Sequence, residues 1–224
     1  MELFDVMRTA FAAREFTDDP VDDDTLHRIF DSARFAPSGG NRQGWRVIVV
    51  RDAATRERLA QLAEPAAKRY VAQIKAGESP WNAVVPSAVS AETIEATPAA
   101  PHLTEPVRRA PVVLVFVVDL KVVASIDQNL ERVGVVSGAS IYPFVWNVLL
   151  GARQAGLGGT ITTLATAREP EIQSLLGIPE SFAVCAVVPL GRPVKQLTRL
   201  RRNAVETFAL RERFDGVPFR VGSR

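Results

Sequence analysis

The run APVVLVFVVDL at residues 110–120 constrains the fold of this chain more than any other segment. Valine is β-branched and favours strands, and the run is bounded by Pro111 and Asp119. It is far shorter than the ~20 apolar residues that a membrane-spanning helix needs. We therefore predict a central strand here. Two further apolar runs predict a core strand in SFAVCAVVPLG at 181–191 and a first strand in WRVIVVRD at 45–52.

Helical spacing of apolar residues predicts the elements that surround these strands. The predicted helices are 2–13, 24–36, 53–64, 134–156 and 168–179, with a helix-like stretch at 65–77 and a turn and strand at 156–166. We expect the helix at 134–156 to be deeply buried and to bend near Pro143. The acidic run Asp22–Asp24 is placed to cap the second helix. Because helices and strands do not alternate as regular βαβ units, we predict an α+β fold in one domain.

Charge and cysteine content exclude several classes of protein. The 27 basic and 25 acidic residues leave a net charge of +2, which predicts neither nucleic-acid binding nor attraction to a membrane. The N-terminus has early acidic residues and lacks the long apolar stretch of a signal peptide. The single Cys185 excludes a disulfide framework and indicates a reducing compartment. We therefore expect a soluble, cytoplasmic protein.

Residues 66–109 are the least patterned part of the chain. Beyond the helix-like stretch, proline, alanine, serine and threonine dominate without clear periodicity. A long segment of this kind is usually a lid, a binding loop or disordered. Trp81 argues against disorder, since a disordered linker seldom needs a tryptophan. We predict a lid or an insertion here, and a plain surface excursion remains the alternative.

The usual catalytic motifs are missing from the sequence. There is no dinucleotide-binding or P-loop glycine pattern, no nucleophile elbow, and the only cysteine lies in a predicted strand. With only His27 and His102 available, the sequence predicts no metal site. If the protein is an enzyme, a bound cofactor supplies the difficult chemistry.

The block FAPSGGNRQGW at residues 35–45 places more polar groups together than a turn requires. Ser38, Asn41 and Gln43 can each donate and accept hydrogen bonds. Gly39 and Gly40 allow the backbone to approach a flat ring without a Cβ atom between them. The pattern indicates either a binding site for a planar polar ligand or a hydrogen-bonded turn without a ligand.

Four segments together resemble the FMN-dependent nitroreductase family, in that family's order and spacing. They are MRTAFAAREFTDDPV, ARFAPSGGNRQGWRVIVV, ARQAGLGGTITT and the basic RLRR. The resemblance implies a three-layer sandwich with a mixed central sheet flanked by helices. It also implies an intertwined homodimer with two FMN sites at the interface, in which a C-terminal arm at about 200–224 embraces the partner.

The resemblance also implies a set of cofactor-binding residues. It places the pyrimidine edge and ribityl chain of FMN beside the block at 37–43, its N5 and O4 atoms beside the GGTITT segment, and its phosphate on arginines, with Arg202 as a near alternative. The implied residues are Arg8, Arg14, Pro37, Ser38, Gly39, Gly40, Asn41, Gln43, Gly159, Thr162, Thr163, Arg199 and Arg201. No side chain receives a catalytic role, because flavin N5 does the chemistry.

The chain departs from the family's pattern at two places. The family often has a further arginine and a serine where this chain has Ala10, Phe11 and Ala12, which bears on how tightly FMN is held. The family frequently has glutamine before Asn147, where this chain has Trp146. Trp146 is expected either to narrow the pocket or to pack at the dimer interface.

The function implied by the resemblance is that of an FMN-dependent oxidoreductase. NADH or NADPH would deliver hydride to flavin N5, and a small-molecule acceptor would then take the electrons in a ping-pong scheme. Nitroaromatics, quinones and activated alkenes are the expected acceptors. The alternatives are a protein that binds or sequesters FMN without turnover, and a family member with another flavin chemistry, such as reductive dehalogenation or flavin breakdown.

Overall fold

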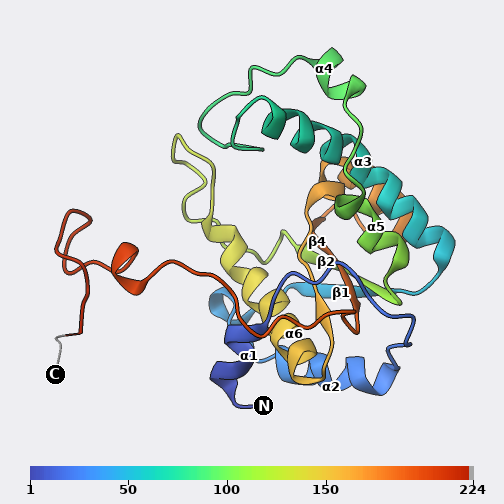
Figure 1. Ribbon diagram of the computed structural model, residues 1–224, viewed down its shortest axis with the longest axis horizontal. Helices are drawn as coiled ribbons and strands as arrows, with labels where there is room; N and C mark the ends of the chain where they lie inside the picture. The colour runs from blue at the N-terminus through green and yellow to red at the C-terminus, as the bar shows by residue number, and fades with distance from the viewer. Residues whose placement is uncertain (222–224) are drawn as a thin grey trace.

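A four-stranded sheet lies between two layers of helices in the computed structural model, which describes residues 1–221 (Figure 1). The strand order is β1-β2-β4-β3, and each neighbouring pair is antiparallel. Parallel pairing occurs at an isolated bridge between Ala12 and Gly159. The strands are β1 (Trp45–Val50), β2 (Val112–Asp119), β3 (Gly158–Gly159) and β4 (Phe182–Gly191). The predicted α+β sandwich is confirmed.

Side chains along β2 point alternately to the two faces of the sheet, and both faces are covered by helices, which explains why the strand is apolar throughout. Val112, Leu114 and Phe116 join a buried cluster with helices α2 (Asp23–Ala33) and α6 (Tyr142–Gln154). Val113 and Val115 join a second cluster with α3 (Ala53–Lys75), α5 (Pro101–Arg109) and α7 (Glu169–Leu176). Successive side chains of a strand point to opposite faces, so a strand covered by helices on both sides has no polar face. The predicted central strand is therefore confirmed.

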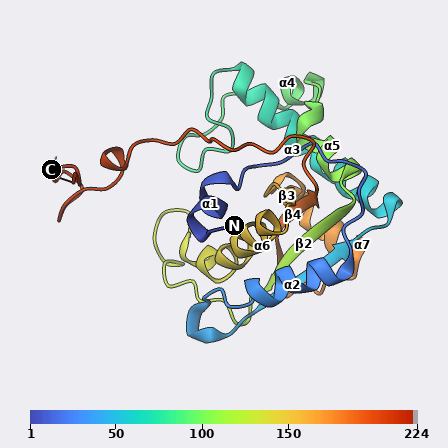
Figure 2. The same ribbon diagram turned by 60° about the horizontal axis from the view of Figure 1, so that its bottom comes forward.

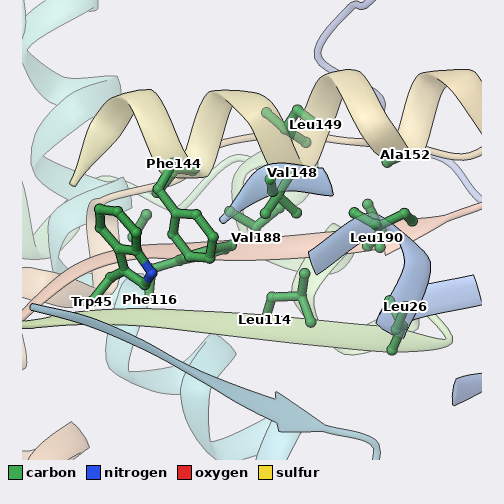
Figure 3. Packing of buried hydrophobic residues seen from close by; sticks show 14 of the residues in the cluster. Leu26, Trp45, Leu114, Phe116, Phe144, Val148, Leu149, Ala152, Val188 and Leu190 are labelled. Atoms are coloured by element: carbon green, nitrogen blue, oxygen red, sulfur yellow. The ribbon is translucent and has the colours of Figure 1, made fainter. Parts of the chain in front are cut away.

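Aromatic rings fill the first of these clusters, beneath α6 (Figure 3). The ring of Phe144 stacks on that of Trp45 with centroids 4.8 Å apart, and it meets the edge of Phe116 at 5.9 Å. Trp45 is the first residue of β1, and it directly follows the polar residues of the block at 37–43 and Gly44. This packing therefore fixes the block against the start of α6.

Seven helices surround the sheet within residues 1–221. They are α1 (Leu3–Thr9), α2 (Asp23–Ala33), α3 (Ala53–Lys75), α4 (Ala91–Ala96), α5 (Pro101–Arg109), α6 (Tyr142–Gln154) and α7 (Glu169–Leu176). The expected cap is present, because Asp22 accepts a hydrogen bond from the backbone N–H of Thr25 at 2.6 Å. A capping carboxylate satisfies an N–H group that the helix itself leaves unpaired.

Three helix predictions need correction. The first helix ends at Thr9, well before residue 13, because the chain then extends to pair Ala12 with Gly159. The segments 53–64 and 65–77 form one helix, α3, which continues through Pro65. The ring removes one backbone hydrogen bond, and buried alanines on either side of it keep the helix packed. Pro143 lies in the first turn of α6, where proline is tolerated, so it begins the helix and does not bend it.

The poorly patterned segment contains α4 and α5, and its loop is held by a carboxylate. Glu78 accepts hydrogen bonds from the Ser87 hydroxyl at 2.6 Å, the Ala88 N–H at 2.7 Å and the Gln73 amide at 3.1 Å. The guanidinium carbon of Arg69 lies 4.3 Å from the centroid of the Trp81 ring. Both helices are short, and α5 contains Pro106, so neither shows enough periodicity in the sequence to be predicted.

Arg108 joins α5 to α3 through several carboxylates, and its side chain is 20% exposed. Its Nε donates to Glu57 at 2.9 Å, and another of its nitrogens donates to Glu64. The hydrogen bond from Arg108 holds the pKa of Glu57 below its usual range. A lowered pKa adds stability above the ordinary pKa of glutamate, and this stability is lost as the pH falls below that value.

Replacing Arg108 with methionine should therefore lower the melting temperature near pH 7 by about 2–4 °C, the shift expected for roughly 1 kcal/mol in a chain of this size. The difference between variant and parent should shrink as the pH falls below the ordinary pKa of glutamate. Thermal melts across that pH range test this expectation. Arg58→Met, at an exposed position of α3, is the control. A constant difference at every pH would show that lost packing, and not charge, causes the effect.

The chain after β4 leaves the body of the molecule as an arm (Figures 1 and 2). A short 3-10 turn at Val205–Thr207 and a bridge between Leu210 and Pro218 are its regular features. The arm carries exposed apolar side chains, including Phe208 and Phe214. An arm of this kind buries little apolar surface on its own chain. Residues 222–224, the end of the predicted arm, lie outside the described part.

None of the helices within residues 1–221 combines the length and the apolar character needed to span a bilayer.

Candidate functional site

A cavity of about 320 Å³ opens where the segment after α1, the helix α6 and the segment after α6 meet. Its wall is largely apolar, with Phe11, Trp146 and Leu149 among the lining side chains. Three arginines also line it, namely Arg14, Arg153 and Arg202. An apolar space with a few positive groups suits a ligand that has a flat or aliphatic body and a negative end.

A second cavity of about 180 Å³ lies beside the first. Both are lined by Arg14, Thr160 and Ile161. The second cavity adds hydroxyl groups from the segment before α7 and side chains from α3 and α5: Thr162, Thr163, Tyr70 and His102. Arg14 thus stands between an arginine-lined space and a hydroxyl-lined space.

The local fold explains why Arg14 lies at this point. After α1 the chain is extended, and the N–H of Ala13 donates to the carbonyl oxygen of Gly159 at 3.1 Å. Gly158 permits this close approach, since a Cβ atom there would lie 3.0 Å from the Ala13 Cβ atom. Gly159 in turn permits the approach of β4, since a Cβ atom there would lie 2.7 Å from the Pro189 carbonyl oxygen. Within residues 1–221 the Arg14 guanidinium forms no ion pair, and it donates to the Ala12 carbonyl oxygen at 3.3 Å. It is therefore available to an anion.

The polar block forms a turn held by its own side chains. The Ser38 hydroxyl accepts from the N–H of Gln43 at 3.0 Å, and the Gln43 amide donates to the Asn41 side chain at 3.1 Å. Asn41 and Gln43 have positive φ angles of 54° and 49°, as does Gly40 at 61°. Strained backbone of this kind is typical of ligand-binding turns. Pro37 is exposed beside them.

The structure places the predicted cofactor residues in two separate groups. The N–H of Gly39 donates to the Ser140 hydroxyl at 3.3 Å, so the block lies at the start of α6. The first cavity, which Arg14 and Gly159 also line, runs along α6 from Trp146 to Arg153. Ser38, Asn41 and Gln43 line neither this cavity nor the second one.

The arginines that were predicted to bind the phosphate also lie at different places in the structure. Arg202, the near alternative, lines the first cavity. Arg8, Arg199 and Arg201 are exposed and line neither cavity. Arg153 lines the first cavity and was missed by sequence reasoning. A basic residue in the last turn of a helix is common, so its position in the sequence carried no specific signal.

Thr163 offers donors to the second cavity. Thr162 is committed to β4, with backbone hydrogen bonds to Val187 of 3.1 and 2.9 Å. The neighbouring Thr163 is exposed, and within residues 1–221 its N–H donates no hydrogen bond. An N–H group at the edge of a cavity can stabilise negative charge that builds up on a bound ring.

Cys185 contributes nothing to these cavities. Burial raises the pKa of its thiol to about 12, so it is not a nucleophile near neutral pH.

A model of the nitroreductase family matches residues 8–192. A putative NADH dehydrogenase/NAD(P)H nitroreductase of Archaeoglobus fulgidus is 26% identical over 204 residues, which is 86% of each chain. The NADH dehydrogenase of Thermus thermophilus is 29% identical over 192 residues, 82% of each chain. A shorter match to a Streptomyces griseus relative, 43% identical over 56 residues, spans 29% of that protein.

Solved structures share the fold at low sequence identity. The NADPH:FMN oxidoreductase of Vibrio harveyi, complexed with NAD+, has a TM-score of 0.67 and 20% identity, over 96% of this chain and 79% of that one. An iodotyrosine deiodinase bound to FMN and 3-iodo-L-tyrosine has a TM-score of 0.65 and 19% identity, over 91% and 96%. These likenesses establish the architecture around the cavities.

Proposed function

Because this chain belongs to the nitroreductase family, we propose that it is an FMN-dependent oxidoreductase that uses NADH or NADPH to reduce a small acceptor. Nitroaromatics, quinones and activated alkenes are the acceptor classes that we propose. When bound, FMN supplies the hydride chemistry at its N5 atom, so the protein needs no nucleophile of its own. We also propose a cytoplasmic location, with the single thiol reduced.

The pair of cavities joined at Arg14 is the observation that carries this proposal. FMN has a flat ring at one end and a phosphate at the other, and the cavities offer hydroxyl groups on one side and arginines on the other. Arg14 and Arg202 would hold the phosphate. The N–H and hydroxyl of Thr163 would donate to the ring edge at N5 and O4, and Thr162 would orient this segment through β4. The residues present therefore fit the cofactor.

A second copy of the chain would complete each site. The block at 37–43 lies at the start of α6 and lines neither of the Arg14 cavities, and a two-fold axis can bring such groups together from two subunits. We propose a homodimer in which one subunit contributes Arg14 and Thr163 and its partner contributes the polar block. The apolar arm that includes Phe208 and Phe214 would bury its exposed side chains on the partner.

Residues 66–109 border the acceptor side of the proposed site. Tyr70 from α3 and His102 from α5 line the second cavity, together with Thr163. We propose that this segment shapes the space in which nicotinamide and acceptor bind in turn. Trp81 lines neither cavity. It would affect the shape of this space indirectly, by packing on Arg69 of α3.

The purified protein should be yellow and carry one FMN per chain. Anaerobic mixing with excess NADH or NADPH should bleach the flavin, and a quinone or nitroaromatic should restore the colour. Absorbance spectroscopy checks both steps, and light scattering gives the mass of the assembly. A colourless protein that fails to bind added FMN at micromolar concentration would contradict the proposal.

A second candidate is a protein that binds FMN without turnover. Ala10, Phe11 and Ala12 favour it, since they make one wall of the arginine-lined cavity apolar. Bound flavin that stays oxidised with both nicotinamides would favour this candidate over the oxidoreductase.

A further inference from the structure

Thr9 links three parts of the chain that surround the first cavity. Its hydroxyl donates to the Asp5 carbonyl oxygen within α1 at 2.6 Å and accepts from Nε of Arg153 on α6 at 2.9 Å. Its own carbonyl oxygen accepts from the side-chain amide of Gln196 at 3.1 Å, in the segment that leads to Arg202. The junction therefore fixes Arg153 and the start of the arm relative to α1.

The hydrogen bond to Thr9 leaves the outer end of Arg153 available. Within residues 1–221 its two terminal nitrogens form no hydrogen bond or ion pair with protein groups. The side chain is half-buried and lines the arginine-rich cavity. A guanidinium that is held at Nε presents its two terminal nitrogens as a fork, the geometry that binds phosphate oxygens in pairs.

The charges around the cavity are unbalanced. Arg14, Arg153 and Arg202 line it, and no carboxylate does. Placing several like charges around a largely apolar space is costly unless an anion accompanies them. A phosphate monoester, with nearly two negative charges and several acceptor oxygens, compensates such a set better than a single carboxylate does.

We infer that Arg153, positioned by Thr9, binds the phosphate of FMN in place of the polar side chains that are absent at residues 10–12. The inference rests on the proposed FMN function and adds a residue to it. The small side chain of Ala10, which also lines this cavity, leaves space for the guanidinium to reach across from α6. A phosphate monoester also occurs in NADPH, and the experiment separates that source.

Arg153→Met should weaken FMN binding about tenfold or more, the usual effect of losing a charge-assisted contact, and should change riboflavin binding less than about twofold. Methionine keeps much of the length and apolar volume of the side chain. Affinities are measured on flavin-free protein by fluorescence titration. Arg58→Met is the matched control, because Arg58 is exposed on α3 and donates to Gln61 at 3.2 Å, away from the cavity.

The role of Thr9 has its own test. Thr9→Val removes the hydroxyl and keeps the shape of the side chain, so FMN binding should weaken severalfold while riboflavin binding does not. Thr9→Ser keeps a hydroxyl and should bind FMN as the parent does. Should Arg153→Met not fold, this pair still tests the inference. Unchanged FMN affinity in Thr9→Val would overturn the positioning role of Thr9.

The parent protein separates failure of this inference from failure of the proposed function. If it binds neither FMN nor riboflavin, the proposed function is wrong and the inference falls with it. If it binds both equally, or if Arg153→Met weakens both equally, flavin binding survives and the phosphate assignment is wrong. If Arg153→Met weakens the binding of adenosine 2′,5′-bisphosphate and leaves the affinity for FMN unchanged, Arg153 recognises the 2′-phosphate of NADPH and the inference is overturned.

Discussion

Replacing Phe116 with alanine should lower the free energy of unfolding by ~3–5 kcal/mol, the usual cost of emptying a buried aromatic site. Phe116 is fully buried in the middle of β2, and its ring meets Phe144, which in turn stacks on Trp45. Neighbouring strands and α6 restrain the surrounding side chains, so the space left behind cannot close completely. Urea unfolding at a fixed protein concentration measures the effect, because assembly would otherwise add to the apparent stability.

Val49→Ala in β1 is the control for this change. Val49 belongs to the same sheet but is 40% exposed, so its truncation should cost less than about 1 kcal/mol. A cost for Phe116→Ala no larger than that of the control would mean that the aromatic cluster is not the packed core of this layer. Loss of bound flavin in Phe116→Ala, through movement of Trp45 and the polar block, would be a secondary result.

Arg14→Met should weaken FMN binding by about a hundredfold, at the upper end for a charge-assisted contact, and should weaken riboflavin much less. Arg14 has a larger expected effect than Arg153 because it borders both cavities, whereas Arg153 borders the first alone. Titration of flavin-free protein with each ligand gives the two affinities.

Arg8→Met is the informative comparison. Arg8 was predicted from the sequence as a phosphate residue, yet it is exposed on α1 and lines neither cavity. We expect its replacement to change FMN affinity little. If Arg14→Met weakens the binding of FMN and riboflavin equally, Arg14 contacts the ring and not the phosphate. A strong effect of Arg8→Met on FMN affinity would place the phosphate near α1.

The sheet and most helices were predictable because their signals are local. The valine run is apolar at every position, and only a strand covered on both faces needs that pattern. The continuous α3 was not predictable, since Pro65 normally ends a helix and only packing against other elements sustains it. The early end of α1 depends on a distant partner, Gly159, which the local sequence does not reveal.

The candidate site was predictable in its residue types more than in its arrangement. The family pattern picked out Arg14, Gly159 and Thr163, which the fold brings together around the cavities. Arg153 could not be found in this way, because its role depends on which side of α6 faces α1. Nor does the sequence show that the block containing Asn41 lies at the start of α6, outside the cavities that these residues line.

That separation has a consequence for mixtures of inactive variants. Suppose that Arg14→Met disables one half of the proposed site and a change at Asn41 disables the other half. In the proposed assembly each homodimer would then be inactive, but a mixed dimer would contain one doubly defective site and one site built from two intact halves. Equal amounts of the two variants, unfolded and refolded together, should regain activity in about one site of every four. Two lesions that each abolish function would thus complement each other, and a solution of purely defective chains would turn over substrate.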